Sequence, residues 1–168
     1  MKNTFLALLS LAVASFAEPY IQVTAELTGA AAAAAKKLSD VNGERTKFPS
    51  KLTTKSGTGC SVELGQVHRY PATVDGKQRE GRHVGIILRV EPKLQGDRIT
   101  FTGGFYRVRL GASTLPTDTA VVATVFSSWE CPFSGTAEPA MPVTIDLTEQ
   151  DGLPSTLKLT FMKVEAQR

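Results

Sequence analysis

Hydrophobic residues occupy every second position through the middle of the chain. Between residues 84 and 91 they fall on one side of an extended segment, namely Val84, Ile86, Leu88 and Val90. This two-residue period is typical of a β-strand with one buried face. We expect Pro92 to end the strand, because proline cannot donate a hydrogen bond to a neighbouring strand.

A returning strand follows directly. Residues 95–97 (Gln-Gly-Asp) have the composition of a chain reversal, and Ile99 and Phe101 then share one face of residues 98–102. Gly103 and Gly104 permit a bend or a bulge after this point. Beyond them Tyr106, Val108 and Leu110 alternate with Arg107 and Arg109. The centre of the chain is therefore predicted to be an antiparallel hairpin to which other strands are added.

One short helix is expected near the N-terminus. Residues 20–27 alternate as a first strand, and residues 30–38 are an alanine run that ends near Lys36 and Lys37. Alanine is the strongest helix former, and lysine suits a helix C-terminus. The alternative is a low-complexity linker, because a helix this short is marginal without packing.

The rest of the chain contains further short strands separated by turn residues. We expect strands at 48–54, 60–64, 67–70, 119–126, 143–147 and 157–161, and a loop at 132–142 that is rich in Gly, Pro and Ala. Trp129 is expected to plug the core beside Cys131. Many short strands with turns between them predict an all-β fold with one short helix, either an antiparallel β-sandwich or an open barrel-like sheet.

The first residues have the pattern of a signal peptide. A lysine at position 2, an apolar stretch at 5–13 and small residues at 15–17 predict cleavage after Ala17. Residues 18–168 then form a single β-sandwich domain in the periplasm or on the outer surface of a Gram-negative bacterium. No later stretch is long and apolar enough for a membrane helix, so we expect no transmembrane segment after cleavage.

Charge and cysteine content refine this picture. The formal net charge of +3 is too small to indicate a nucleic-acid partner. Cys60 and Cys131 would lie in an oxidising compartment, where two cysteines usually pair, and both fall at predicted strand ends. We expect a Cys60–Cys131 disulfide; the alternative is two separately buried thiols.

Three segments resemble the β-domain of the secretins, the outer-membrane ring proteins of type II and type III secretion and of type IV pili. They are residues 48–65, residues 84–99 (V-G-I-I-L-R-V-E-P-K-L-Q-G-D-R-I) and residues 157–164. The first strand and the alanine helix also match the family order. The resemblance implies a secretin-core-like sandwich; an immunoglobulin-like sandwich is the other architecture that the pattern fits.

The chain also departs from the secretin pattern. We expect it to be without the N domains that precede the secretin core, and residues 126–135 stand in place of the family's glycine-rich motif. No long amphipathic hairpin remains to cross a membrane. We therefore expect a reduced relative that docks onto a type IV pilus or secretion apparatus, rather than a pore.

No catalytic constellation is evident. His68 and His83 could approach each other, but a metal site would need Asp75 or Glu63 as well, and the spacing matches no zinc motif. A hydrolase based on His68, Asp75 and a serine has no nucleophile-elbow pattern to support it. We expect no enzymatic activity, no metal and no cofactor.

A local group of basic residues is the candidate binding feature. Its members are Arg69, Lys77, Arg79, Arg82 and His83. It could bind an acidic partner, or it could be an ordinary solvated loop. The predicted function is a non-enzymatic cell-envelope protein that acts by docking to protein partners of a pilus or secretion apparatus. The alternative is a glycan- or ligand-binding module in which Trp129, Tyr70 or Tyr106 forms a stacking platform.

Overall fold

The computed structural model describes residues 19–42, 48–71, 79–111, 124–147 and 154–165. The predicted signal peptide, residues 1–17, lies outside them. The elements in chain order are β1 (Tyr20–Thr28), α1 (Gly29–Asn42), β2 (Ser50–Lys55), β3 (Cys60–Pro71), β4 (Arg79–Gln95), β5 (Arg98–Leu110), β6 (Phe126–Ala137), β7 (Pro142–Asp146) and β8 (Ser155–Val164).

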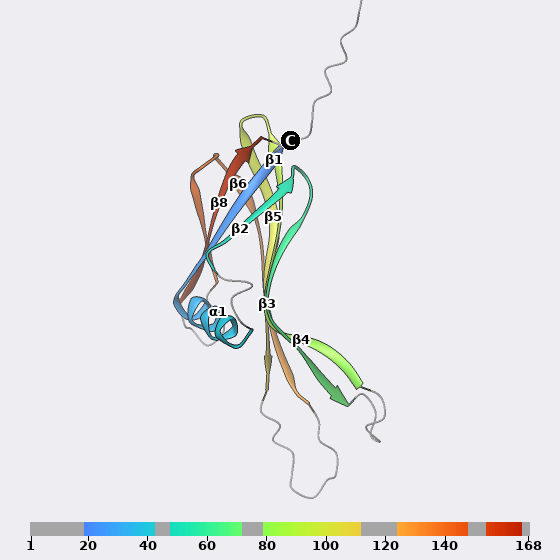
Figure 1. Cartoon of the computed structure of the whole chain (residues 1–168). Coiled ribbons are helices and arrows are strands. Elements are labelled where there is room, and N and C mark those ends of the chain that lie inside the picture. The colour runs from blue at the N-terminus through green and yellow to red at the C-terminus, as the bar shows by residue number, and fades with distance from the viewer. Residues whose placement is uncertain (1–18, 43–47, 72–78, 112–123, 148–153, 166–168) are drawn as a thin grey trace, which may run out of the picture.

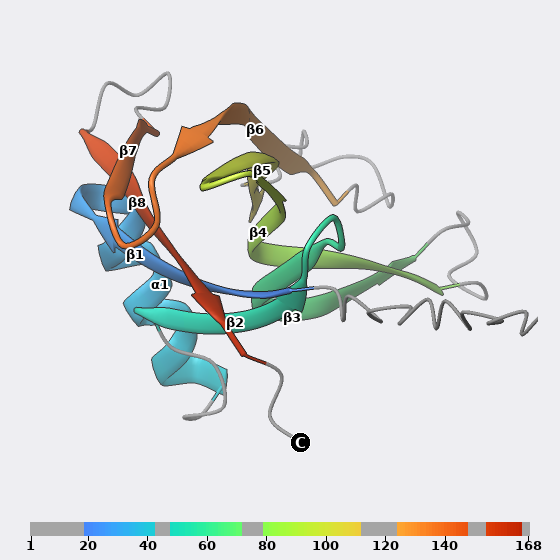
Figure 2. The same cartoon turned by 90° about the horizontal axis from the view of Figure 1, so that it is seen from above.

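The strands form two antiparallel sheets that face each other. Sheet A has the order β2-β1-β8-β7, and sheet B has the order β3-β4-β5-β6 (Figure 1). Seen from above, the sheets curve around a common interior (Figure 2). The predicted all-β sandwich with one short helix near the N-terminus is therefore confirmed.

The core lies between the inner faces of the two sheets. Sheet A contributes fully buried side chains from β1 and β8, and Phe161 on β8 stacks on Phe101 of β5 with a centroid distance of 4.9 Å. Phe105 is also fully buried. The alternation at 84–91 is confirmed, because the inward residues Ile86, Leu88 and Val90 are at most 1% exposed.

Hydrogen bonds across the strand edges join the two sheets. The amide of Gly57, in the turn that leads from β2 to β3, donates to the carbonyl of Pro92 on β4 at 2.8 Å. On the other side, the amide of Ala140 between β6 and β7 donates to the carbonyl of Phe161 at 2.7 Å. The sandwich is thus tied at both edges as well as through its core.

Helix α1 starts where β1 meets the beginning of β8. Gly29 has φ +67°, and a Cβ at this position would lie 2.0 Å from the carbonyl oxygen of Pro154. The amides of Ala30 and Ala31 donate to the Pro154 carbonyl and to the Ser155 hydroxyl, at 3.2 and 3.0 Å. Bonds of this kind satisfy amides that have no partner within the helix. The predicted helix is confirmed and is longer than expected.

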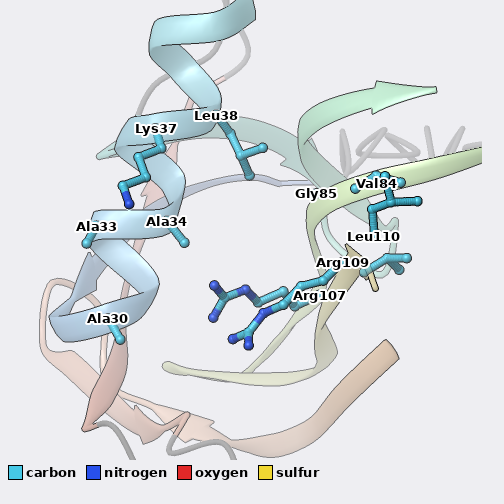
Figure 3. A pocket seen from close by; sticks show the side chains of 11 residues that line it. Ala30, Ala33, Ala34, Lys37, Leu38, Val84, Gly85, Arg107, Arg109 and Leu110 are labelled. Carbon is cyan, nitrogen blue, oxygen red and sulfur yellow. The ribbon is translucent and has the colours of Figure 1, made fainter. Parts of the chain in front are cut away.

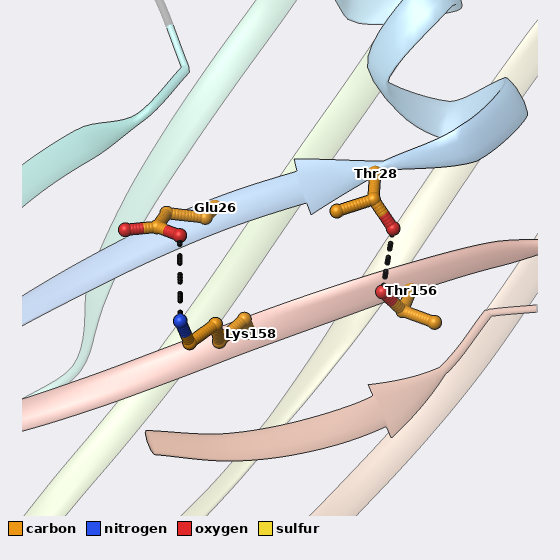
Figure 4. A network of polar contacts seen from close by, with 4 residues as sticks. All are labelled: Glu26, Thr28, Thr156 and Lys158. Atoms are coloured by element: carbon orange, nitrogen blue, oxygen red, sulfur yellow. Dashed lines mark hydrogen bonds and ion pairs between the residues drawn. The ribbon is translucent and has the colours of Figure 1, made fainter. Parts of the chain in front are cut away.

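The outer face of sheet A is polar, as the alternation requires. Glu26 on β1 lies 3.9 Å from Lys158 on β8, and the hydroxyls of Thr28 and Thr156 are 2.7 Å apart (Figure 4). Both pairs are direct cross-strand neighbours. Because the ion pair is about half exposed, it contributes little to stability.

The reversal at 95–97 is confirmed, but the prediction that Pro92 ends the strand is wrong. β4 continues to Gln95, and Pro92 pairs with Phe101 of β5. The carbonyl of Pro92 faces Gly57, on the side where pairing with β3 has already stopped at Val90. The N–H that proline lacks would point to this same side, so the β4–β5 ladder loses no bond.

Two further expectations for sheet B need correction. The register runs without a bulge through Gly103 and Gly104, and the ring of Phe133 lies over Gly103. Residues 132–137 belong to strand β6 and not to a loop. Pro132 is tolerated because β6 is an edge strand. Most of the strand predicted at 119–126 lies outside the described residues.

The stack between the sheets gives the first testable prediction. Replacing Phe161 with alanine is expected to lower the free energy of unfolding by about 3–5 kcal/mol, because it leaves a cavity against Phe101. Replacing its neighbour Met162, which is 45% exposed, is expected to change it by less than about 0.5 kcal/mol. Urea unfolding followed by Trp129 fluorescence measures both. Equal effects of the two substitutions would contradict this account of the core.

Candidate functional site

Two hairpins leave the sandwich at the same end. Pairing between β4 and β5 stops at Gly85 and Val108, while β3–β4 and β5–β6 each continue as separate pairs (Figure 1). Gly65 and Gly85 face each other at the point of separation, with φ +150° and +149°. A Cβ on either would come within 2.2 Å of a carbonyl oxygen on the facing strand. The glycine pair therefore lets β3 and β4 turn away from β5 together.

An aromatic and basic cluster joins the two hairpin ends. The ring of Phe126 on β6 lies 5.1 Å from Tyr70 and 6.1 Å from His68, both edge-on. The guanidinium of Arg82 lies over the same ring at 5.0 Å. We call His68, Tyr70, Arg82 and Phe126 the hairpin-end cluster. Its contacts combine aromatic packing with a cation–π interaction.

The hairpin ends also expose apolar side chains. Val67 is 63% exposed, and Leu110 and Val125 are each 48% exposed. Three of the five exposed large hydrophobic residues in the described part of the chain therefore lie on these two hairpins. Exposed apolar groups beside Tyr and Arg are typical of protein–protein contact surfaces.

The structure divides the predicted basic group. Arg82 joins the hairpin-end cluster, opposite His68 in the register. Arg69, Arg79 and His83 occupy alternate register positions, so they belong to the other face of the hairpin. Lys77 lies outside the described residues. Of this basic group, Arg82 alone belongs to the cluster. His68 and Tyr70, named above as a metal candidate and a stacking candidate, also belong to it. Sequence reasoning missed Phe126 as its centre.

In the described part of the β3–β4 hairpin, the two histidines do not come together as a metal site would require. His68 and His83 are one register position apart and belong to opposite faces, and Asp75 is among the undescribed residues. Within the described ranges, no three His, Cys, Asp or Glu side chains lie close enough to hold a metal ion. The phenol of Tyr70 donates to Glu80 at 3.0 Å, and this bond raises the pKa of Tyr70.

The predicted disulfide is not formed, and both cysteines are free thiols. Cys60 is on β3 and Cys131 is on β6, the two edges of sheet B, with β4 and β5 between them. Neighbouring strands are about 4.8 Å apart, so three such spacings far exceed the Cα separation that a disulfide allows. The thiols instead point toward carbonyl oxygens, of Val90 at 3.4 Å and of Asp146 at 3.6 Å.

The three aromatic residues of the alternative function do not form one platform. Trp129 is partly buried and packs edge-on against Phe105 at 6.1 Å, which agrees with its expected role in the core. Tyr106 pairs with Ile87, on the face of sheet B opposite the core residues of β4. The guanidinium of Arg89 lies over its ring at 5.6 Å. Tyr70 is on the projecting hairpin. Nothing in this arrangement favours a stacked glycan.

Comparison with known structures gives the class of fold. The chain is similar to the type IV competence pilus secretin PilQ of V. cholerae, with 13% identity and a TM-score of 0.51 over 70% of this chain and 36% of that one. It is also similar to the secretin domain β-barrel of InvG from the Salmonella SPI-1 injectisome, with 10% identity and a TM-score of 0.50 over 90% of this chain and 65% of that one. The fold is thus a secretin-like all-β sandwich.

The similarity shows the fold alone, and the chain spans 36% of the PilQ chain and 65% of the InvG chain. No protein-family model and no curated protein matches the sequence. In the described part of the chain, no helix has the length and apolar character needed to cross a membrane.

The cysteine environments give a second prediction. Burial raises the pKa of Cys60 to about 11, which leaves roughly one thiol in a thousand ionised at pH 8. Because the thiolate is the nucleophile, a Cys131→Ser variant should react with iodoacetamide about 100-fold more slowly than glutathione at pH 8. The rate should rise about tenfold per pH unit while the fold persists. Mass spectrometry measures it.

A second measurement tests the free thiols directly. Unreduced protein that is unfolded in urea with iodoacetamide should gain two adducts, one on each cysteine. Complete absence of adducts on Cys60 and Cys131, together with an intramolecular link between them, would contradict the described geometry.

Proposed function

We propose that this chain is a non-enzymatic cell-envelope protein that binds another protein of a type IV pilus or secretion apparatus through its hairpin ends. The observation that carries the proposal is a secretin-like sandwich from which two hairpins project, with the hairpin-end cluster between them. Of the similar structures, PilQ is a secretin of a type IV competence pilus and InvG belongs to an injectisome. A periplasmic or outer-surface location, reached through the predicted signal peptide, is part of the proposal.

The chemistry of the hairpin ends supports docking. Tyr and Arg are enriched among the residues that dominate protein–protein binding energy, and Phe126 presents its ring between them. The exposed Leu110, which pairs with Phe126 in the register and so shares its face, supplies apolar area beside this centre. A partner that covers the cluster would bury the Phe126 ring and desolvate the Arg82 guanidinium, which favours an apolar contact with an acidic group nearby.

Site-specific cross-linking in the source bacterium tests the proposal. A photoreactive benzoylphenylalanine at position 126 is expected to form an adduct with an identified component of a pilus or secretion apparatus. The matched control places the same residue at position 162, which is exposed on sheet A. An adduct with an envelope enzyme, equal adducts at both positions, or no adduct at position 126 would overturn the proposed docking surface.

Affinity measurements with the identified partner extend the test. Phe126→Ala and Arg82→Ala are each expected to weaken binding about 30-fold, which corresponds to about 2 kcal/mol for a central interface residue. Met162→Ala is expected to change the affinity less than twofold. Binding measured by calorimetry that is unaffected by both hairpin substitutions would place the contact elsewhere on the molecule.

A further inference from the structure

A second feature, separate from the hairpin ends, is a pocket on the outer face of sheet B. It has a volume of about 370 Å³, and small-molecule sites usually measure roughly 300–1,000 Å³. Its floor includes the backbone of Gly103 and Gly104 on β5, which have no side chains to fill the space. The outward side chains around this floor are those of Ser61, Arg89, Glu91, Thr102 and Tyr106.

This pocket is distinct from both neighbouring features of the molecule. It lies on the opposite side of sheet B from the pocket beside α1, into which Arg107 extends (Figure 3). It shares no lining residue with that pocket or with the hairpin-end cluster. Phe126 of the cluster pairs with Leu110, six residues beyond Gly104 on β5, and six strand residues span about 20 Å. The proposed docking function therefore makes no use of it.

Tyr106 forms one wall of the pocket because the next outward position on β5 is a glycine. A Cβ on Gly104 would lie 2.8 Å from the hydroxyl oxygen of Tyr106, so only glycine lets the tyrosine lean over the strand here. The guanidinium of Arg89 lies over the Tyr106 ring at 5.6 Å. This contact uses the positive charge of the arginine and leaves its N–H groups able to donate hydrogen bonds.

Arg89 and Glu91 place opposite charges on the same side of β4, two residues apart. Both side chains are exposed, and among the described residues they form no ion pair with each other. The residue opposite Glu91 in the register is Thr102 and not a cation. The pocket therefore offers a group that binds anions and a group that binds cations, held apart from each other.

The other lining groups are small and mostly polar. Ser61 and Thr102 bring hydroxyls, whereas Val90 is 1% exposed and pairs with Cys60 in the core-facing row. An alkyl chain would find no aliphatic wall here. Glu91 would repel a phosphate, and Arg89 would repel a simple amine. A molecule that carries both an ammonium and a carboxylate group would match both charges.

We propose that this pocket binds a small zwitterionic α-amino acid. Arg89 donates charge-assisted hydrogen bonds to the carboxylate, and Glu91 accepts hydrogen bonds from the ammonium group. The hydroxyls of Ser61 and Thr102 bind a short polar side chain, and Tyr106 closes the pocket. This inference is independent of the docking surface on the hairpin ends.

NMR titration of the unaltered protein is the first test. The probes are serine, N-acetylserine without the ammonium group, and serinamide without the carboxylate, at a mildly acidic pH where serinamide is charged. Serine is expected to shift the amide signals of Gly103 and Gly104. A ligand this small is expected to bind with a dissociation constant of about 1 mM. Each derivative should bind at least about tenfold more weakly than serine, because it lacks one charge-assisted contact.

Two variants assign each charge to its partner. Arg89→Gln should weaken serine and N-acetylserine at least about tenfold and leave serinamide unchanged. Glu91→Gln should weaken serine and serinamide and leave N-acetylserine unchanged. The matched controls are Lys93→Gln and Glu63→Gln, which remove exposed charges from the same face of sheet B outside the pocket lining, and they should change nothing.

Three results would overturn the proposal. They are equal affinity for serine and either derivative, serine binding that survives both Arg89→Gln and Glu91→Gln, and no saturable shift in the unaltered protein well above the expected dissociation constant. The probe comparison needs no substitution, so it decides the ligand class even if a variant fails to fold.

Discussion

The packing of one sheet face against the other is the constraint on which the rest of the molecule depends. Phe161 on β8 and Phe101 on β5 stack across the interior at 4.9 Å, and both inner faces are built from alternating apolar residues. In sheet A, β8 lies between β1 and β7, so the first and the last strand of the described chain are neighbours. The same pairing places Ser155 where it binds the first amides of α1.

The glycine pair at positions 65 and 85 lies where sheet B stops lining the core and the β3–β4 hairpin begins to project from it. Up to this pair, alternate residues of β3 and β4 are buried; beyond it, the two strands have no third strand beside them. The described side chains of the free hairpin are therefore exposed or only half-buried. The contacts of Phe126 with Tyr70 and Arg82 partly cover them, and the rest remains available to a partner.

The helix covers one end of the sandwich incompletely and leaves a pocket of about 440 Å³ between α1 and strands β4 and β5. Alanine favours the helix and allows close packing at Ala31 and Ala35. The same small side chain leaves space at the positions beside them, and β5 fills part of that space with charged groups from Arg107 and Arg109. The small alanine side chains thus explain both the close packing of the helix and the open space next to it.

Local pattern determined much of this fold. The alternation at β1, β4 and β8, the reversal at 95–97 and the alanine helix follow from periodicity and intrinsic propensity, which act over a few residues. Tertiary structure decided which strands are neighbours. It therefore decided that Cys60 and Cys131 lie on opposite edges of sheet B, that Pro92 and Pro132 sit where a missing amide costs no ladder bond, and that Phe126 meets Arg82. It also turned the arginine side of β5 inward, because alternation separates two faces of a strand, whereas only the packing of the sheets determines which face is covered.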